Sequence, residues 1–153
     1  MILPLILHVL AATLWVGGMF FAHVMLRPAL QPLDGPTRLG VWRRVLRRFL
    51  PAVWVVIGVL LLSGYVMVFL GFGGFKGVGI YVHIMQGLGI IMILAFAHLF
   101  FSPWKRFQRA LDAQDNDGAA ASLAQIRAIV TFNLILGLIV VAVGASGRYW
   151  GIG

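Results

Sequence analysis

The chain has 153 residues, of which 61% are hydrophobic and 10% are charged, and its formal net charge is +8. A soluble domain carries roughly a quarter charged residues, so this composition indicates a membrane protein. The chain has no cysteine. This excludes disulfides, thiolate metal sites, iron–sulfur clusters and c-type haem attachment.

Four apolar stretches are each long enough to cross a bilayer, which takes about 20 such residues. They cover residues 4–26, 50–72, 78–101 and 126–147. The first stretch lacks the basic start and the Ala-x-Ala site of a cleaved signal peptide, so we expect a permanent helix. The sequence therefore predicts an all-α fold, a single transmembrane four-helix domain over residues 1–153 with up-and-down topology.

Basic residues gather in two of the connections between these stretches. Residues 27–48 hold six arginines and residues 105–127 hold four lysines and arginines, whereas the opposite side has only Lys76 and Arg148. Because Lys and Arg accumulate on the cytoplasmic side, we expect both chain termini on the outer side, in a bacterial inner (cytoplasmic) membrane. The positive charge then attracts anionic lipid of the bilayer and does not indicate nucleic-acid binding.

Two connecting segments carry further charge patterns. Within residues 37–50 the sequence sets Arg43, Arg44, Arg47 and Arg48 against apolar side chains. Two interpretations stay open: a separate helix lying at the headgroups, or a cytoplasmic extension of the second span with snorkelling arginines. Residues 112–118 hold three aspartates in a polar, mobile stretch. We interpret them as a solvated turn within an inner connection over residues 102–126, and not as a metal site.

All four histidines lie inside predicted spans: His8 and His23 in the first, His83 and His98 in the third. Fifteen residues separate the members of each pair, a rise of roughly 22 Å and a return to within about 60° of the starting direction. The first and third helices of an up-and-down bundle run parallel, so His8 should match His83 in depth and His23 should match His98. Hydrogen-bonded histidines or a proton relay would be the alternatives, but ionisable residues in hydrocarbon are functional by default.

Two facing imidazoles at each of two depths are what two bis-histidine b-type haems require. We therefore predict a membrane cytochrome that moves electrons across the bilayer through two haem b groups, His8/His83 outside and His23/His98 inside. Lys76 and Arg148 are the cations that could pair with the propionates of the outer haem. The expected exchange partner is a quinone or a small redox substrate, and any enzyme activity would be that of an oxidoreductase. The sequence gives no oligomeric state.

Copper is the alternative occupant, since imidazole nitrogen and methionine sulfur both bind it. Residues two apart on a helix point about 200° apart, so neither His23 with Met25 nor His83 with Met85 can share an ion. Met19 lies one turn from His23 and could join it. The sequence therefore leaves a copper-binding or copper-transporting membrane protein open as an alternative.

The segment Leu7-His8-Val-Leu-Ala-Ala-Thr-Leu-Trp15-Val-Gly17-Gly18 resembles the first helix of the copper-resistance D (CopD-like) membrane family. It is also similar to the HemJ-type protoporphyrinogen oxidase family. The first resemblance implies copper transport. The second implies a haem held at His8 and oxidation of a porphyrinogen. The two-haem histidine pattern is in turn similar to that of the dihaem cytochromes b of respiratory chains.

Overall fold

The structure, a computed structural model, describes residues 1–150 apart from the side chain of Arg148. Within that range the chain is helical and has no strand, which confirms the all-α prediction. Short π-helical and 3-10 segments lie at Phe21–Leu26, Met67–Gly71, Phe75–Gly77 and Gly147–Tyr149. The α-helices of the described range are α1 Ile2–Phe20, α2 Arg27–Ala29, α3 Gly35–Val66, α4 Ile80–Phe101, α5 Pro103–Asp112 and α6 Asn116–Ser146.

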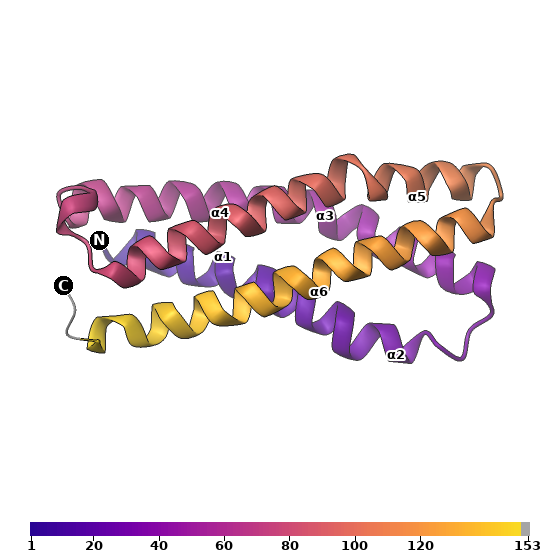
Figure 1. Cartoon of the computed structure of the whole chain (residues 1–153), viewed down its shortest axis with the longest axis horizontal. Coiled ribbons are helices and arrows are strands. Elements are labelled where there is room, and N and C mark those ends of the chain that lie inside the picture. The colour runs from indigo at the N-terminus through magenta and orange to yellow at the C-terminus, as the bar shows by residue number, and fades with distance from the viewer. Residues whose placement is uncertain (151–153) are drawn as a thin grey trace.

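Four continuous helical stretches are long and apolar enough to cross a membrane: Ile2–Ala29, Gly35–Gly71, Ile80–Asp112 and Asn116–Ser146. Each contains one of the predicted spans or nearly all of it, so the four-helix membrane prediction is confirmed. The helices lie along one long axis, and the N-terminus and the end of α6 lie at the same end of the bundle (Figure 1). Which end faces the cytoplasm stays a prediction from charge.

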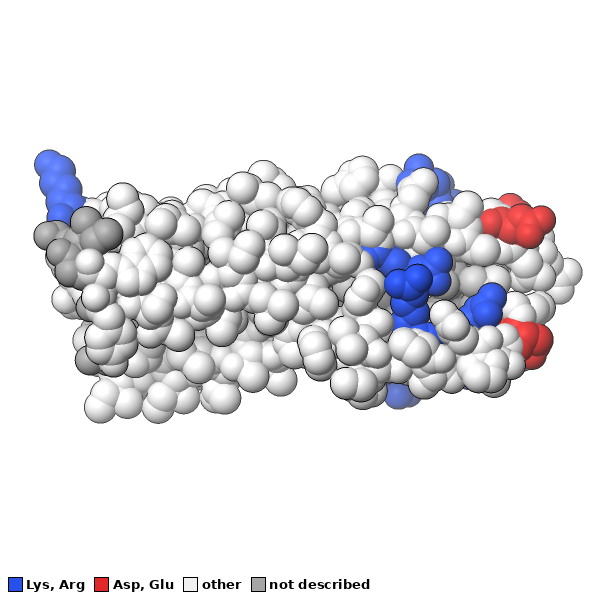
Figure 2. All heavy atoms as spheres, turned by 60° about the horizontal axis from the view of Figure 1, so that its bottom comes forward, with Lys and Arg blue, Asp and Glu red and all other residues white. Residues whose placement is uncertain are grey.

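The charged residues lie mainly at the other end of the bundle. Figure 2 shows basic and acidic side chains gathered together at one end of the visible face, while the middle of the molecule carries none. Ten of the twelve lysines and arginines, and all four aspartates, fall within residues 27–48 and 105–127. A neutral middle with a basic end fits the division of a membrane protein into a hydrocarbon part and a headgroup part.

The helices pack as two hairpins. α1 lies mainly against α3 and α4 lies mainly against α6, and α6 also contacts α1 and α3. α1 and α4 make few close backbone approaches, because they belong to different hairpins. The first and third spans therefore meet through side chains, such as the Trp15 and Phe96 rings at 6.1 Å, and not through close backbone packing.

The α3 helix settles the open question about residues 37–50. It runs without a break from Gly35 to Val66, so the arginine-rich segment is an extension of the second span at the basic end of the bundle. The backbone N–H of Thr37 donates to the Asp34 carboxylate at 3.0 Å and caps the helix. This hydrogen bond holds the pKa of Asp34 below its ordinary value. The apolar side of the extension is buried at Leu39, Trp42, Leu46 and Leu50.

The connection over residues 102–126, in which the sequence predicts a solvated turn, is mostly helical. α5 and the first turns of α6 fill most of it, and the turn between them covers only residues 113–115. Pro103 stands in the first turn of α5, where its missing N–H is no loss. Trp104 and Phe107 are buried against the rest of the bundle. Arg43 of α3 pairs with Asp112 at 2.6 Å and joins α5 to the second span.

Gly137 of α6 lies where α1, α4 and α6 come closest at mid-depth. A Cβ at this position would lie 2.8 Å from Val16 Cγ2 and 3.3 Å from the terminal methyl of Met92. Val16 is β-branched and cannot swing away easily. The close approach of the two hairpins therefore depends on a glycine here.

We expect Gly137→Ala to destabilise the protein by about 1–3 kcal/mol through this overlap. The matched control is Gly58→Ala in α3, where a Cβ meets no atom within 4 Å. Thermal unfolding in detergent, followed by circular dichroism, compares the two variants. Equal unfolding temperatures would show that α1 and α4 are not tightly packed on α6.

Candidate functional site

His8 is turned toward the second span. Its Nδ1 lies 3.1 Å from the Leu60 carbonyl oxygen and 3.1 Å from Ser63 Oγ, both in α3. Ser63 Oγ itself donates to the carbonyl of Val59. Because a carbonyl only accepts, Nδ1 carries the proton, and Nε2 keeps a lone pair. Gly64 makes room for the ring, since a Cβ there would lie 3.2 Å from His8 Cε1.

His23 is held in the same way at the inner end, but by the fourth span. Its Nδ1 lies 3.2 Å from Thr131 Oγ1 of α6. The Thr131 hydroxyl donates to the Arg127 carbonyl at 2.8 Å, so its oxygen accepts from His23 Nδ1. Metal-binding histidines usually donate their second ring nitrogen to such an acceptor. Both histidines of the first span, His8 in α1 and His23 in the π-helical segment Phe21–Leu26, therefore present a metal-competent Nε2.

His83 and His98 of α4 lie on the outside of the bundle, and both are exposed. Within the described part of the chain neither makes a hydrogen bond, and the His83 ring lies 6.1 Å from the Phe75 ring. The inward side of α4 is occupied instead by Met92, Phe96 and Leu99. Nine residues of helix turn by about 180°, which places His83 opposite Met92.

The structure does not bring the four histidines together as the facing pairs His8/His83 and His23/His98. The α1 imidazoles turn toward acceptors on α3 and α6, and the α4 imidazoles point outward. Of the two expected propionate partners, Lys76 is exposed in the turn Phe75–Gly77, and the side chain of Arg148 lies outside the described residues.

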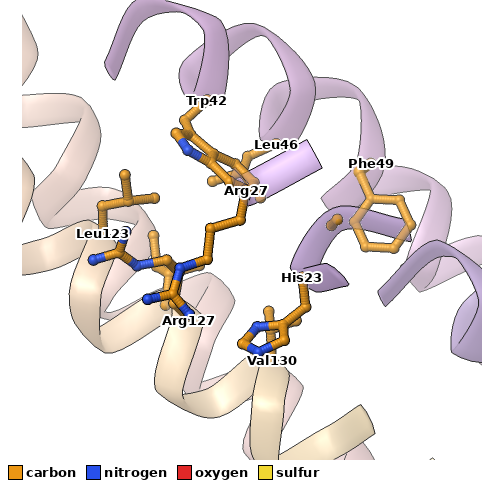
Figure 3. Close-up of a pocket in the computed structure, with 10 residues that line it drawn as sticks. His23, Arg27, Trp42, Leu46, Phe49, Leu123, Arg127 and Val130 are labelled. Carbon is orange, nitrogen blue, oxygen red and sulfur yellow. The ribbon is translucent and has the colours of Figure 1, made fainter. Parts of the chain in front are cut away.

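A small cavity lies beside His23, between α1, α3 and α6 (Figure 3). Its volume is about 20 Å³, room for about one water molecule. The side chains of Arg27 and Arg127 extend toward one another across it, with His23 below them. No carboxylate is among the lining residues.

This cavity bears on the two-haem hypothesis. Sites for small organic molecules measure about 300 Å³ or more, so a porphyrin does not fit beside His23 in this packing. The two-haem hypothesis stays a prediction, and it requires histidine pairings that a single chain in this packing does not form.

Two methionine side chains approach Gly137 in the middle of the bundle. The terminal methyls of Met19 and Met92 lie 3.6 and 3.3 Å from the Cβ position of Gly137, and both side chains are buried. One turn before Gly137 on α6, the Asn133 side chain donates a hydrogen bond from Nδ2 to the Met92 carbonyl at 3.0 Å. Its Oδ1 is buried and has no hydrogen-bond partner within the described residues. An unpaired buried acceptor is rare enough to mark a candidate site.

A second methionine contact lies one level outward. The Met85 sulfur is 3.3 Å from the Cβ position of Gly144, also on α6. Sequence reasoning considered Met19 and Met85 only beside histidines and missed the Met19–Met92 pair. The signal that could have found it is the seven-residue spacing of Gly137 and Gly144, which places two small residues on one face of α6.

The sequence of this chain matches the model of a known protein family. The model of the family "copper resistance protein D" matches residues 43–146, about two thirds of the chain. The chain belongs to the copper resistance protein D family. This confirms the first of the two family resemblances, although the match lies outside residues 7–18; the HemJ-type resemblance stays a prediction.

A curated relative extends the similarity to almost the whole chain. An uncharacterized protein of Aquifex aeolicus (strain VF5) is 32% identical over 146 residues, which cover 94% of this chain and 92% of the relative. No solved structure matches. Family membership and the four apolar helices make this an integral membrane protein.

We expect Thr131→Val to release the His23 tautomer, because valine keeps the shape of threonine but offers no acceptor for Nδ1. Nitrogen NMR of labelled histidine in detergent reports which ring nitrogen carries the proton. The matched control is Ser63→Ala, in which His8 retains the Leu60 carbonyl as its acceptor. His23 keeping its Nδ1 proton in Thr131→Val would show that Thr131 does not set the tautomer.

Proposed function

We propose that this protein binds copper inside the four-helix bundle and passes it across the membrane, so that copper is the transported substrate. The observation that carries the proposal is the approach of the buried Met19 and Met92 side chains to Gly137, in a bundle where His8 and His23 each present Nε2. Thioether and imidazole groups are ligands that suit copper, and thioethers select its reduced form. Membership of the copper resistance protein D family supports this reading.

The donors are spread through the depth of the bundle. Met19 follows His8 by eleven residues and precedes His23 by four along α1, or about 16 and 6 Å of helix rise. The Met85–Gly144 contact lies one level outward of the Met19 and Met92 side chains, since Gly144 follows Gly137 by seven residues on α6, or about 10 Å. Successive donor levels are therefore separated by about 6–10 Å.

The composition of the spans supports a soft metal ion. Residues 4–26, 50–72, 78–101 and 126–147 contain no aspartate or glutamate. Carboxylates are the ligands that magnesium, calcium and manganese prefer. The bundle interior therefore offers little to hard divalent cations.

The test is binding of reduced copper by the purified protein in detergent, measured by competition with bicinchoninate. We expect Met19→Leu combined with Met92→Leu to weaken binding at least about tenfold, equivalent to about 1.4 kcal/mol. Leucine keeps the volume of methionine at little cost in packing. The matched control is Met25→Leu, because Met25 is 51% exposed at the membrane edge. Equal affinities in all three proteins would refute an interior thioether site.

The second candidate is electron transfer through b haem, with a quinone or a small redox substrate as partner. The observation that favours it is the fifteen-residue interval shared by His8/His23 and His83/His98. A haem would supply one-electron redox chemistry. It would require α1 and α4 to separate from their present packing.

An optical spectrum distinguishes the two candidates. A red preparation with a sharp b-type α-band on reduction, from which His8→Ala and His23→Ala each remove about half the haem, would support the cytochrome. A colourless preparation that retains copper would support transport. Haem content that is unchanged in the double histidine variant would count against the cytochrome.

A further inference from the structure

One exposed stripe runs along the whole length of α4. Its members recur every three or four residues, the spacing of a single helix face. They are Ile80, His83, Gly87, Ile91, Leu94 and His98. The stripe is apolar except for the two imidazoles, which stand near its opposite ends.

The two imidazoles are in the wrong place for a surface that faces lipid. A polar group moved into an apolar medium without a hydrogen bond costs about 2–7 kcal/mol, depending on the reference state. Ionisable residues within membrane helices almost always face the bundle interior or pair with one another. His83 and His98 do neither within the described part of the chain, so a partner that covers the stripe and offers polar groups at these two depths would satisfy both imidazoles.

A second copy of the chain meets that need at both ends of the stripe. In a two-fold dimer whose axis is normal to the membrane, every residue lies at the depth of its own counterpart. The two His83 side chains of such a dimer then face each other at one level, and the two His98 side chains face each other at the other level. Gly87 lies between the levels with open space at its Cβ position, which allows two helices to approach closely.

We propose that α4 forms a symmetric dimer interface that holds one copper ion at each of two levels, one between the two His83 side chains and one between the two His98 side chains. The assignment of copper rests on the proposed function, whereas the interface rests on the α4 stripe alone. Imidazole nitrogen is a normal copper ligand. The two levels lie fifteen residues apart, or roughly 22 Å.

Cross-linking of the full chain in nanodiscs tests the interface, because the chain contains no cysteine that could give a background. Leu94→Cys places a thiol on the stripe, and Val55→Cys places one at a position that is 68% exposed on α3. We expect Leu94→Cys to form a disulfide-linked dimer under mild oxidation and Val55→Cys to stay monomeric. A monomeric Leu94→Cys protein, or equal cross-linking at both positions, would overturn the proposed interface.

Copper content then tests the ligands. We expect His83→Gln and His98→Gln each to remove one copper ion per dimer and their combination to remove both, with the double variant still folded because both side chains are exposed. Unchanged copper in the double variant, or a b-type haem bound by these histidines, would overturn the copper assignment.

The same measurement separates this inference from the proposed function. Copper that is lost in His83→Gln/His98→Gln but kept in Met19→Leu/Met92→Leu would support the interface site and refute the interior site. The opposite pattern would refute the interface site alone.

Discussion

The hydrocarbon of a membrane supplies no hydrogen-bond partner, so every polar group in this bundle must find one within the protein. Hydroxyl groups solve the problem locally: Ser63 and Thr131 each donate to a backbone carbonyl one turn back. Their oxygens are then acceptors only. Each one receives the Nδ1–H of a histidine from α1, and this fixes the tautomer that leaves Nε2 available. The demand for satisfied hydrogen bonds thus prepares His8 and His23 as ligands.

The same requirement identifies the places where partners are missing. Within the described residues, Asn133 Oδ1 is buried without a partner, and His83 and His98 make no hydrogen bond on the outer side of α4. Unsatisfied polar groups are costly, and native structures keep few of them. Asn133 lies one turn from Gly137, which the Met19 and Met92 side chains approach. His83 and His98 lie on the α4 stripe. Both proposals therefore start from the few groups that the fold does not satisfy.

Most of the fold could be predicted from the sequence, because a run of about 20 apolar residues is typical of a membrane-spanning helix. α5 could not be found by hydropathy, since it is short and half polar, although Pro103 and the spacing of Trp104 and Phe107 are helix signals. The directions in which the histidines face could not be predicted for a different reason. Spacing along a helix gives depth, but the direction in which a side chain faces depends on which helices pack together. Here α1 pairs with α3 and α4 pairs with α6.

The proximity of Met19 and Met92 could not be predicted from the sequence either. Nothing in the sequence around Met92 links it to Met19, which precedes it by seventy-three residues. Gly137 becomes informative only when its neighbours in space are known, because its missing Cβ leaves room for methionine side chains from both hairpins.

The cavity beside His23 also bears on how a copper ion would leave the bundle in the proposed transport. A copper ion released from His23 toward the basic end meets the guanidinium groups of Arg27 and Arg127, and no carboxylate lines the cavity to offset them. Bare Cu⁺ is repelled by both groups, and the repulsion is strong where water is scarce. Departure is favourable only when the acceptor brings its own negative charge, as a thiolate carrier or an anionic chelator would. In the proposed copper pathway, the two arginines would therefore disfavour release of the unescorted ion at the basic end of the bundle.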